Sequence, residues 1–175
     1  VADIKDTSDI AEEIRATGGD ALALSVDVSN EDQVKMMVAQ TIEHYGSLEV
    51  LINNAAIGSN IPRVPVTELS GEDWDALMSI NVKGSFFCAK AVIPQMQKQK
   101  YGKIINIGST TMMTGLTHRL HYTSAKGAIL AMTRSLAAEL GGDGIRVNTA
   151  AYGLVTSQLN EEQFAGDPEF EAKVL

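Results

Sequence analysis

The feature that most constrains the fold is a regular alternation of short apolar runs with longer helical patterns. The apolar runs have the length of β-strands, and the segments between them have the length and spacing of α-helices. Strands are predicted at 21–28, 48–56, 103–109 and 145–153, and helices at 30–46, 70–99 and 122–142. Because short connections between parallel strands require an intervening helix, this order predicts an α/β fold with a parallel sheet flanked by helices.

Residues that start and stop helices support these segments. Ser29 or Asn30 is expected to cap the first long helix, and Gly46 to end it. Pro94 lies near the end of the segment 70–99, where it is predicted to bend or break the helix. No linker or internal repeat interrupts the pattern, so residues 1–175 are expected to form a single, partial domain.

Composition excludes several classes of function. The chain has 14 basic and 22 acidic side chains, a net charge of −8, and no cluster of like charges. Binding to nucleic acid or to an anionic membrane is therefore not expected, because both require clustered Lys and Arg. No apolar run approaches the roughly 20 residues of a membrane span. The single cysteine, Cys88, predicts a buried thiol and a reducing, cytoplasmic environment, and no metal site is expected.

Polar and small residues follow the predicted strands. Asp27 ends the first run, Asn53 and Asn54 end the second, and Ser109 ends the third. In a parallel sheet the carboxyl ends of the strands meet at one edge, where ligands bind. Taken singly, each of these residues is equally explained as a turn or cap residue.

The stretch "HYTSAKGA" contains a tyrosine four residues before a lysine. Tyr122 and Lys126 therefore share one face of the predicted helix. A cation beside a phenol stabilises the phenolate, which would make the pair a general acid and base for an alcohol or carbonyl. The alternative is an ordinary aromatic residue beside a solvated lysine.

The order of several motifs resembles the short-chain dehydrogenase/reductase family. These are "NNAA" after a strand, Asn81 in "INVKGSF", Ser109 thirteen residues before Tyr122, and "RVNTAAYGLVTS". The resemblance extends from about Val1 to Ser157 and implies a Rossmann-like, doubly wound parallel sheet. It also implies a catalytic tetrad of Asn81, Ser109, Tyr122 and Lys126. In the family, the serine holds the substrate oxygen, the tyrosine transfers the proton, the lysine holds the nicotinamide ribose, and the asparagine anchors a water.

The same resemblance implies a nicotinamide cofactor. "VADIK" is similar to the end of the family's second strand, where an acid bonds the adenosine ribose, and Asp3 stands at that position. A carboxylate there would repel the 2′-phosphate of NADP, so NAD is expected and NADP is less favoured. The cofactor contacts implied by the resemblance are Asp3, Asp27, Val28, Asn53, Ala55, Tyr122, Lys126, Gly153, Val155 and Ser157.

Two departures from the family pattern stand out. Tyr152 occupies the place where the family usually has proline before Gly153, and the glycine-rich turn GxxxGxG that cradles the pyrophosphate occurs nowhere in the sequence. We therefore expect that the fold is incomplete in this chain, that the chain is part of a longer protein, and that its sheet exposes unpaired edges.

Substrate and assembly are implied by segments flanking the tetrad. Four apolar side chains between Ser109 and Tyr122 predict an apolar wall for a secondary alcohol or ketone: Met112, Met113, Leu116 and Leu120. The neighbouring His118, Arg119 and His121 are expected to be solvated. Residues 157–175 resemble part of the family's substrate lid, and the two long helices resemble those through which members form homotetramers or homodimers.

The function expected from the sequence is hydride transfer between NAD(H) and a secondary alcohol or ketone, with Tyr122 as general acid and base. Two alternatives stay open. One is an NADP-dependent reductase of 3-oxoacyl thioesters, and the other is a catalytically silent dinucleotide-binding scaffold. The complete set of Asn81, Ser109, Tyr122 and Lys126 argues against the scaffold, whereas the lacking glycine turn and Tyr152 favour it.

Overall fold

The computed structural model describes residues 1–58, 61, 63–153 and 155. In this part of the chain five parallel strands form two sheets, one with the order β1-β2 and one with the order β3-β4-β5. The strands are β1 (Ala2–Asp3), β2 (Leu24–Ser25), β3 (Val50–Asn53), β4 (Gly102–Ser109) and β5 (Ile145–Tyr152).

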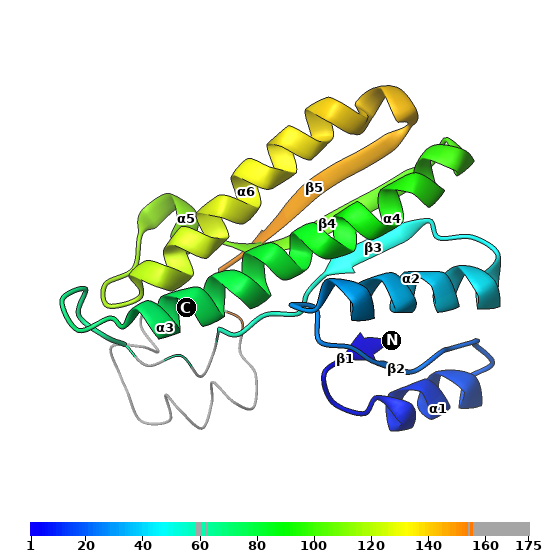
Figure 1. Ribbon diagram of the computed structural model, residues 1–175, viewed down its shortest axis with the longest axis horizontal. Helices are drawn as coiled ribbons and strands as arrows, with labels where there is room; N and C mark the ends of the chain where they lie inside the picture. Colours follow the sequence, from blue (N-terminus) through cyan, green and yellow to red (C-terminus); the bar gives the residue numbers. More distant parts are fainter. Residues whose placement is uncertain (59–60, 62, 154, 156–175) are drawn as a thin grey trace.

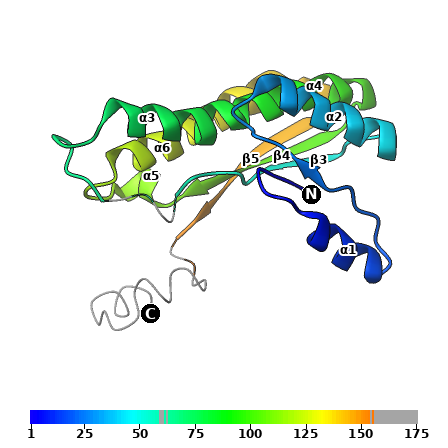
Figure 2. The same ribbon diagram turned by 60° about the horizontal axis from the view of Figure 1, so that its bottom comes forward.

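Helices cover one side of the three-stranded sheet (Figure 1). Figure 2 shows α2, α4 and α6 on this side, whereas α1 lies on the opposite side beside β1 and β2. The Rossmann-like α/β class predicted from the sequence is therefore confirmed. The helical elements are α1 (Ser8–Ala16), α2 (Glu31–Tyr45), α3 (Gly71–Met78), a π-helical turn (Ser79–Gly84), α4 (Ser85–Gln99), α5 (Thr111–Thr114), α6 (Leu120–Leu140) and a 3₁₀ turn (Gly141–Asp143).

The main core lies between the three-stranded sheet and helices α2, α4 and α6. Ile104 of β4 and Met96 of α4 are fully buried there, together with Ile145 of β5. Branched and long apolar side chains at alternate strand positions pack against the apolar stripes of the helices, which excludes water from one face of the sheet. Cys88 is also buried, as expected, and burial raises the pKa of its thiol to about 11.

The predicted helix signals act at the expected places. The side chain of Asn30 accepts hydrogen bonds from the backbone N–H groups of Asp32 and Gln33 and so caps α2. Gly46 ends this helix in the left-handed region, with φ of 77°. Helix α2 thus begins and ends through local chemistry that the sequence already displays.

Other expectations need correction. The run 21–28 forms only the two-residue strand β2, since residues 21–23 and 26–27 lie outside the strand and Val28 lies in a turn. The segment 70–99 does not break at Pro94, since α4 continues to Gln99. Its irregularity instead lies earlier, in the π-helical turn Ser79–Gly84. Helices α1 and α5 were not predicted at all.

The helix from Gly71 to Gln99 bears on the expectation that the chain does not span a membrane. By length and composition alone it is long and apolar enough to cross a bilayer. However, 44% of its most apolar stretch is buried within the fold. The core helix of a globular domain has the same properties, so this helix gives little support for a membrane span.

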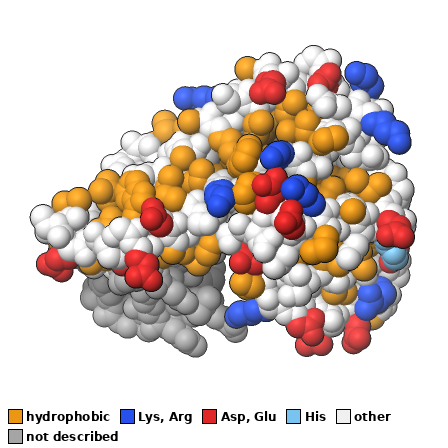
Figure 3. Space-filling view, viewed as in Figure 1, with side chains coloured by type: hydrophobic (Ala, Val, Ile, Leu, Met, Phe, Trp, Pro, Cys, Tyr) orange, Lys and Arg blue, Asp and Glu red, His pale blue; other side chains and the backbone are white. Residues whose placement is uncertain are grey.

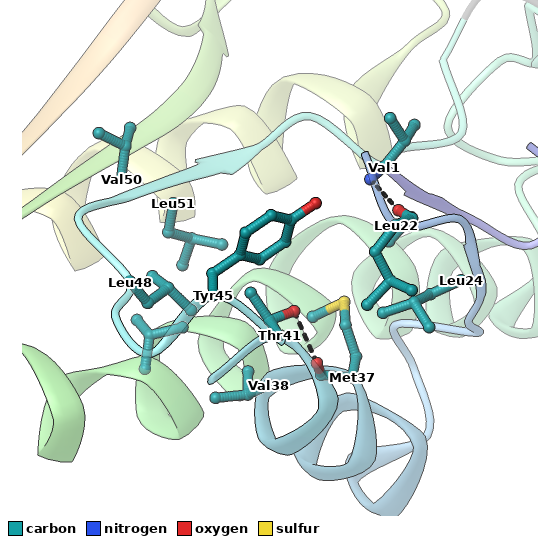
Figure 4. Close-up of a pocket in the computed structure, with 12 residues that line it drawn as sticks. Val1, Leu22, Leu24, Met37, Val38, Thr41, Tyr45, Leu48, Val50 and Leu51 are labelled. Carbon is teal, nitrogen blue, oxygen red and sulfur yellow. Dashed lines mark hydrogen bonds between the residues drawn. The ribbon is translucent and has the colours of Figure 1, made fainter. Parts of the chain in front are cut away.

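An apolar groove runs between the two sheets (Figure 4). Val1 and Leu24 line it from the two-stranded sheet, and Val50 and Leu51 line it from β3. Among the described strands β1 pairs only with β2 and β3 only with β4, so the expected unpaired edges are present. Val50 consequently stays 47% exposed.

Candidate active site

Ser109 is the last residue of β4, at the carboxyl edge of the three-stranded sheet. Its side chain is buried, and its Oγ lies 3.0 Å from the Oγ1 of Thr111 and 3.3 Å from the backbone nitrogen of the same residue. The N–H of Thr111 donates to this oxygen. The hydroxyl of Ser109 is therefore fixed at the edge where the sequence places it.

Tyr122 and Lys126 lie in the first two turns of α6, as predicted, and share one face. The Nζ atom of Lys126 lies 5.8 Å from the centre of the Tyr122 ring and donates a 2.7 Å hydrogen bond to the carbonyl of Ile107 in β4. Lys126 is buried, and desolvation lowers the pKa of its ammonium group. The lysine thus ties the start of α6 to the strand that ends in Ser109.

Asn81 lies in the π-helical turn and is 2% exposed. Its side chain holds the backbone of Ile57 in both directions, accepting from the N–H and donating to the carbonyl, each at 2.9 Å. The π turn is stabilised further by Ser85, whose hydroxyl donates to the carbonyl of Asn81 at 2.9 Å. Asn81 therefore anchors the loop that follows β3, and π turns of this kind are frequent at functional sites.

A buried polar network, not predicted from the sequence, joins these elements. Asn53 Nδ2 donates to Asn106 Oδ1, and Asn106 Nδ2 donates to Thr133 Oγ1, both at 2.8 Å. Thr149 of β5 also donates to Thr133 Oγ1 at 2.8 Å. Asn106 is fully buried, so every partner it makes replaces a bond to water. The network fixes β3, β4, β5 and α6 relative to one another.

A cavity of about 180 Å³ opens at the carboxyl ends of β1 and β3. It is lined by Asp3, Val28, Asn53 and Ala55, four of the residues predicted to contact the cofactor. Gly84 also lines it, and a Cβ atom there would lie 2.7 Å from Cγ2 of Val28. Only glycine allows the π turn to approach the loop after β2 this closely, which brings the two sides of the cavity together.

The remaining predicted contacts are not all gathered in this cavity. Asp27 is engaged locally, because its carboxylate accepts from the N–H and the hydroxyl of Ser29 at 2.9 and 2.7 Å. Gly153 follows β5, and Val155 is 55% exposed. Ser157 and the predicted lid 157–175 lie outside the described residues.

Arg119 and His121 correct a sequence expectation. Both were expected to be solvated, as His118 is, but Arg119 is 9% exposed and His121 is 1% exposed. Arg119 Nη1 donates to the carbonyl of Gly58 at 2.8 Å. No periodic signal could have shown this burial, because it results from the loop after β3 folding over the start of α6.

Comparison with known proteins agrees with this arrangement. A family model described as short chain dehydrogenase matches residues 2–168. The chain belongs to the short-chain dehydrogenase family. The resemblance of the motifs is thereby confirmed, and the tetrad positions Asn81, Ser109, Tyr122 and Lys126 fall within the matched range.

Individual members of the short-chain dehydrogenase family show different chemistry on this fold. The chain is 36% identical over 152 residues to a 3-oxoacyl-[acyl-carrier-protein] reductase of Synechocystis sp., covering 87% of this chain and 60% of that protein. The structure of an NAD⁺-bound xylitol dehydrogenase matches with a TM-score of 0.84, 32% identity and coverage of 95% and 62%. ElxO with NADP bound matches with a TM-score of 0.77, 30% identity and coverage of 81% and 56%. The chain thus spans about three fifths of the length of such relatives.

Proposed function

We propose that the protein containing this chain is an oxidoreductase that transfers a hydride between NAD(H) and a secondary alcohol or ketone. The observation that carries the proposal is the position of Tyr122. Its phenol lies beside the buried ammonium group of Lys126, at the same sheet edge as the fixed hydroxyl of Ser109. A proton donor and acceptor, a cation and an oxygen-binding hydroxyl are the groups that this chemistry requires.

Each side chain has a distinct task in this proposal. Ser109 would bind the substrate oxygen and orient it toward Tyr122, which gives a proton during carbonyl reduction and takes one during alcohol oxidation. Lys126 would stabilise the phenolate and bind ribose hydroxyls. The side chain of Asn81 forms hydrogen bonds with the backbone of Ile57 and would thereby hold the loop after β3 against the site. Asn81 would also anchor a water molecule there.

The cavity beside β1 and β3 suits the cofactor. Its lining combines the polar side chains of Asp3 and Asn53 with apolar ones such as Leu51. Bound there, a nicotinamide dinucleotide supplies or accepts the hydride. The carboxylate of Asp3 favours NAD over NADP, because it would accept from ribose hydroxyls and repel a 2′-phosphate.

The substrate proposed is one with an apolar group. A hollow of about 330 Å³ beside the start of α6 is lined mainly by apolar side chains, among them Leu116, Leu120, Val64 and Val66. Leu116 and Leu120 belong to the apolar wall predicted from the sequence. Met113, 73% exposed, lies outside this hollow.

Assembly and location are also proposals. An apolar surface on α3, the π turn, α4 and α6 includes Met78, Val82, Phe86 and Met132, and Figure 3 shows hydrophobic side chains along these helices. Such a surface suits a homodimer or homotetramer. The chemistry proposed needs no membrane or nucleic acid, and a cytoplasmic location suits the free thiol of Cys88.

A second candidate is a reductase of 3-oxoacyl thioesters, which is the activity named for the 36% identical relative. It uses the same four catalytic residues and differs in substrate and in the expected choice of NADP. The two candidates are separated by offering both cofactors with simple ketones and with 3-oxoacyl thioesters.

The decisive experiment compares the native protein with Tyr122→Phe by following nicotinamide absorbance. The variant is expected to lose about 100- to 10,000-fold in kcat, the range for removal of a general acid or base. Tyr101→Phe serves as a control, because Tyr101 is 45% exposed and directly precedes β4, at the opposite end of that strand from Ser109. Unchanged turnover in Tyr122→Phe would contradict the mechanism, and no turnover in the native protein would favour the silent scaffold.

A further inference from the structure

Arg119 is a buried cation that the proposed mechanism does not use. It directly precedes α6 and is 9% exposed, with one guanidinium nitrogen donating to the carbonyl of Gly58 at 2.8 Å. Its Nε atom is buried and has no hydrogen-bond partner among the described residues. A buried donor without a partner is unfavourable by itself, so its presence points to a ligand.

The charge of Arg119 is not balanced within the described part of the chain. None of the salt bridges there involves Arg119 or Arg63. Desolvation lowers the pKa of Arg119, and the neighbouring positive charge of Arg63 lowers it further. The guanidinium of Arg119 is therefore a buried charge without an ion-pair partner among the described residues, in a chain whose net charge is −8. A bound anion would balance this charge.

The same guanidinium lies beside the catalytic phenol. A Cβ atom placed on Gly58, whose carbonyl Arg119 binds, would lie 3.3 Å from Cε2 of Tyr122. One small substrate could therefore place an anionic group against Arg119 and its reacting oxygen against Tyr122.

Thr123 connects this position to the apolar hollow. It lies four residues after Arg119, hence on the same side of the chain at the start of α6, and its buried hydroxyl has no partner among the described residues. Thr123 also lines the hollow formed with Leu116, Leu120 and Val64. A ligand with an anionic end and an apolar remainder would satisfy both regions.

We propose that Arg119 binds a carboxylate of the substrate, so that the protein acts on short hydroxy or oxo carboxylic acids. A carboxylate is favoured over the phosphate of a thioester carrier, because the guanidinium of Arg119 lies next to Tyr122. The carrier phosphate would be at the far end of a long arm, away from the reacting carbon. Planar guanidinium groups also match the two oxygens of a carboxylate. This inference rests on the proposed function for its catalytic part only.

Binding can be tested without turnover by NMR of the arginine Nε–H groups. The signal of Arg119 is identified by its loss in Arg119→Lys, and the protein is titrated with 3-hydroxybutanoate, its methyl ester and inorganic phosphate. The proposal expects the carboxylate, and not the ester, to shift this signal. It is overturned if the carboxylate has no effect, if the ester acts equally, or if phosphate binds more tightly than the carboxylate.

Turnover provides the second test. The native protein should prefer the hydroxy acid to its methyl ester in kcat/KM, and Arg119→Gln should reduce that preference about 10- to 100-fold, the usual value of a charge-assisted hydrogen bond. Arg134→Gln, at an exposed position farther along α6, should not change it. Equal use of acid and ester by the native protein would refute the carboxylate site. Absence of turnover with every alcohol would refute the proposed function alone and leave the NMR result standing.

Discussion

The two sheets of the molecule differ sharply in how they hold functional residues. The three-stranded sheet has strands of four and eight residues, packs against α4 and α6, and carries Ser109 and the network around Asn106. The two-stranded sheet has strands of two residues, and Asp3 at its end is exposed. The residues proposed for proton transfer are thus held in place by a buried core. Asp3, the residue proposed for cofactor choice, lies at the exposed edge of a short sheet. We therefore expect the proposed proton transfer and the proposed cofactor choice to be separable by mutation.

The largest effect is expected from Asn106→Leu, which removes the centre of the network at nearly constant side-chain volume. Asn53 would lose its 2.8 Å partner and leave a buried amide N–H unsatisfied, whereas Thr133 would keep its hydrogen bonds to Ile129 and Thr149. The free energy of unfolding should fall by about 1–3 kcal/mol in urea denaturation, the cost of one unsatisfied buried group. Asn148→Leu, an exposed position on β5, should change it by less than about 0.5 kcal/mol. An equal loss of unfolding free energy in Asn106→Leu and Asn148→Leu would contradict the view that the buried network stabilises the three-stranded sheet.

A smaller and purely functional effect is expected from Asp3→Asn. The amide can still accept the 2.9 Å hydrogen bond from the N–H of Lys5, so stability should not change. Loss of the charge should shift the NAD-to-NADP ratio of kcat/KM toward NADP by about tenfold, as for one interaction of about 1.4 kcal/mol. Asp9→Asn, in the first turn of α1, is the matched control. An unchanged ratio would show that Asp3 does not select the cofactor.

The smallest expected effect concerns pH and His121. Burial lowers the pKa of His121 below its usual 6.5, and Arg119 lowers it further, while Asp73 opposes this shift. The unfolded chain therefore binds the proton first as the pH falls below 6.5, so His121 makes the fold less stable on the acid side. His121→Gln should flatten the decrease in unfolding free energy between pH 7 and pH 5, measured by urea denaturation. His118→Gln, at an exposed position, should leave the slope unchanged.

The sequence predicted the parts of the fold that follow from local chemistry. Helix α2 is capped by Asn30 and ends at the left-handed Gly46, as expected. Strand β4 also forms where its apolar residues predicted a strand. Tyr122 and Lys126 share a helical face because their spacing alone requires it. The order of strands and helices indicated the fold class, and the order of the motifs that contain Asn81, Ser109 and Tyr122 indicated the family.

The parts that were missed depend on contacts between distant segments. The burial of Arg119 requires Gly58, 61 residues away in sequence, and Asn106 acquires its role only from Asn53 and Thr133. The weak β2 strand shows the opposite error, since apolar character in 21–28 did not create a long ladder. The spacing of apolar residues predicts which face of a helix or strand is buried. It does not predict which polar side chains from distant segments will form hydrogen bonds with one another.

The π-helical turn at Ser79–Gly84 has a consequence for how such a site can change over time. A π turn accommodates one more residue than a regular helical turn, and the helices on either side of it continue without interruption. Losing one residue there would restore a regular helix and rotate Asn81 away from Ile57, although the asparagine itself would be retained. The contact between Asn81 and Ile57 therefore depends on the number of residues in the helix as much as on the asparagine itself. A one-residue deletion could abolish the activity of the proposed site although Asn81, Ser109, Tyr122 and Lys126 are all retained.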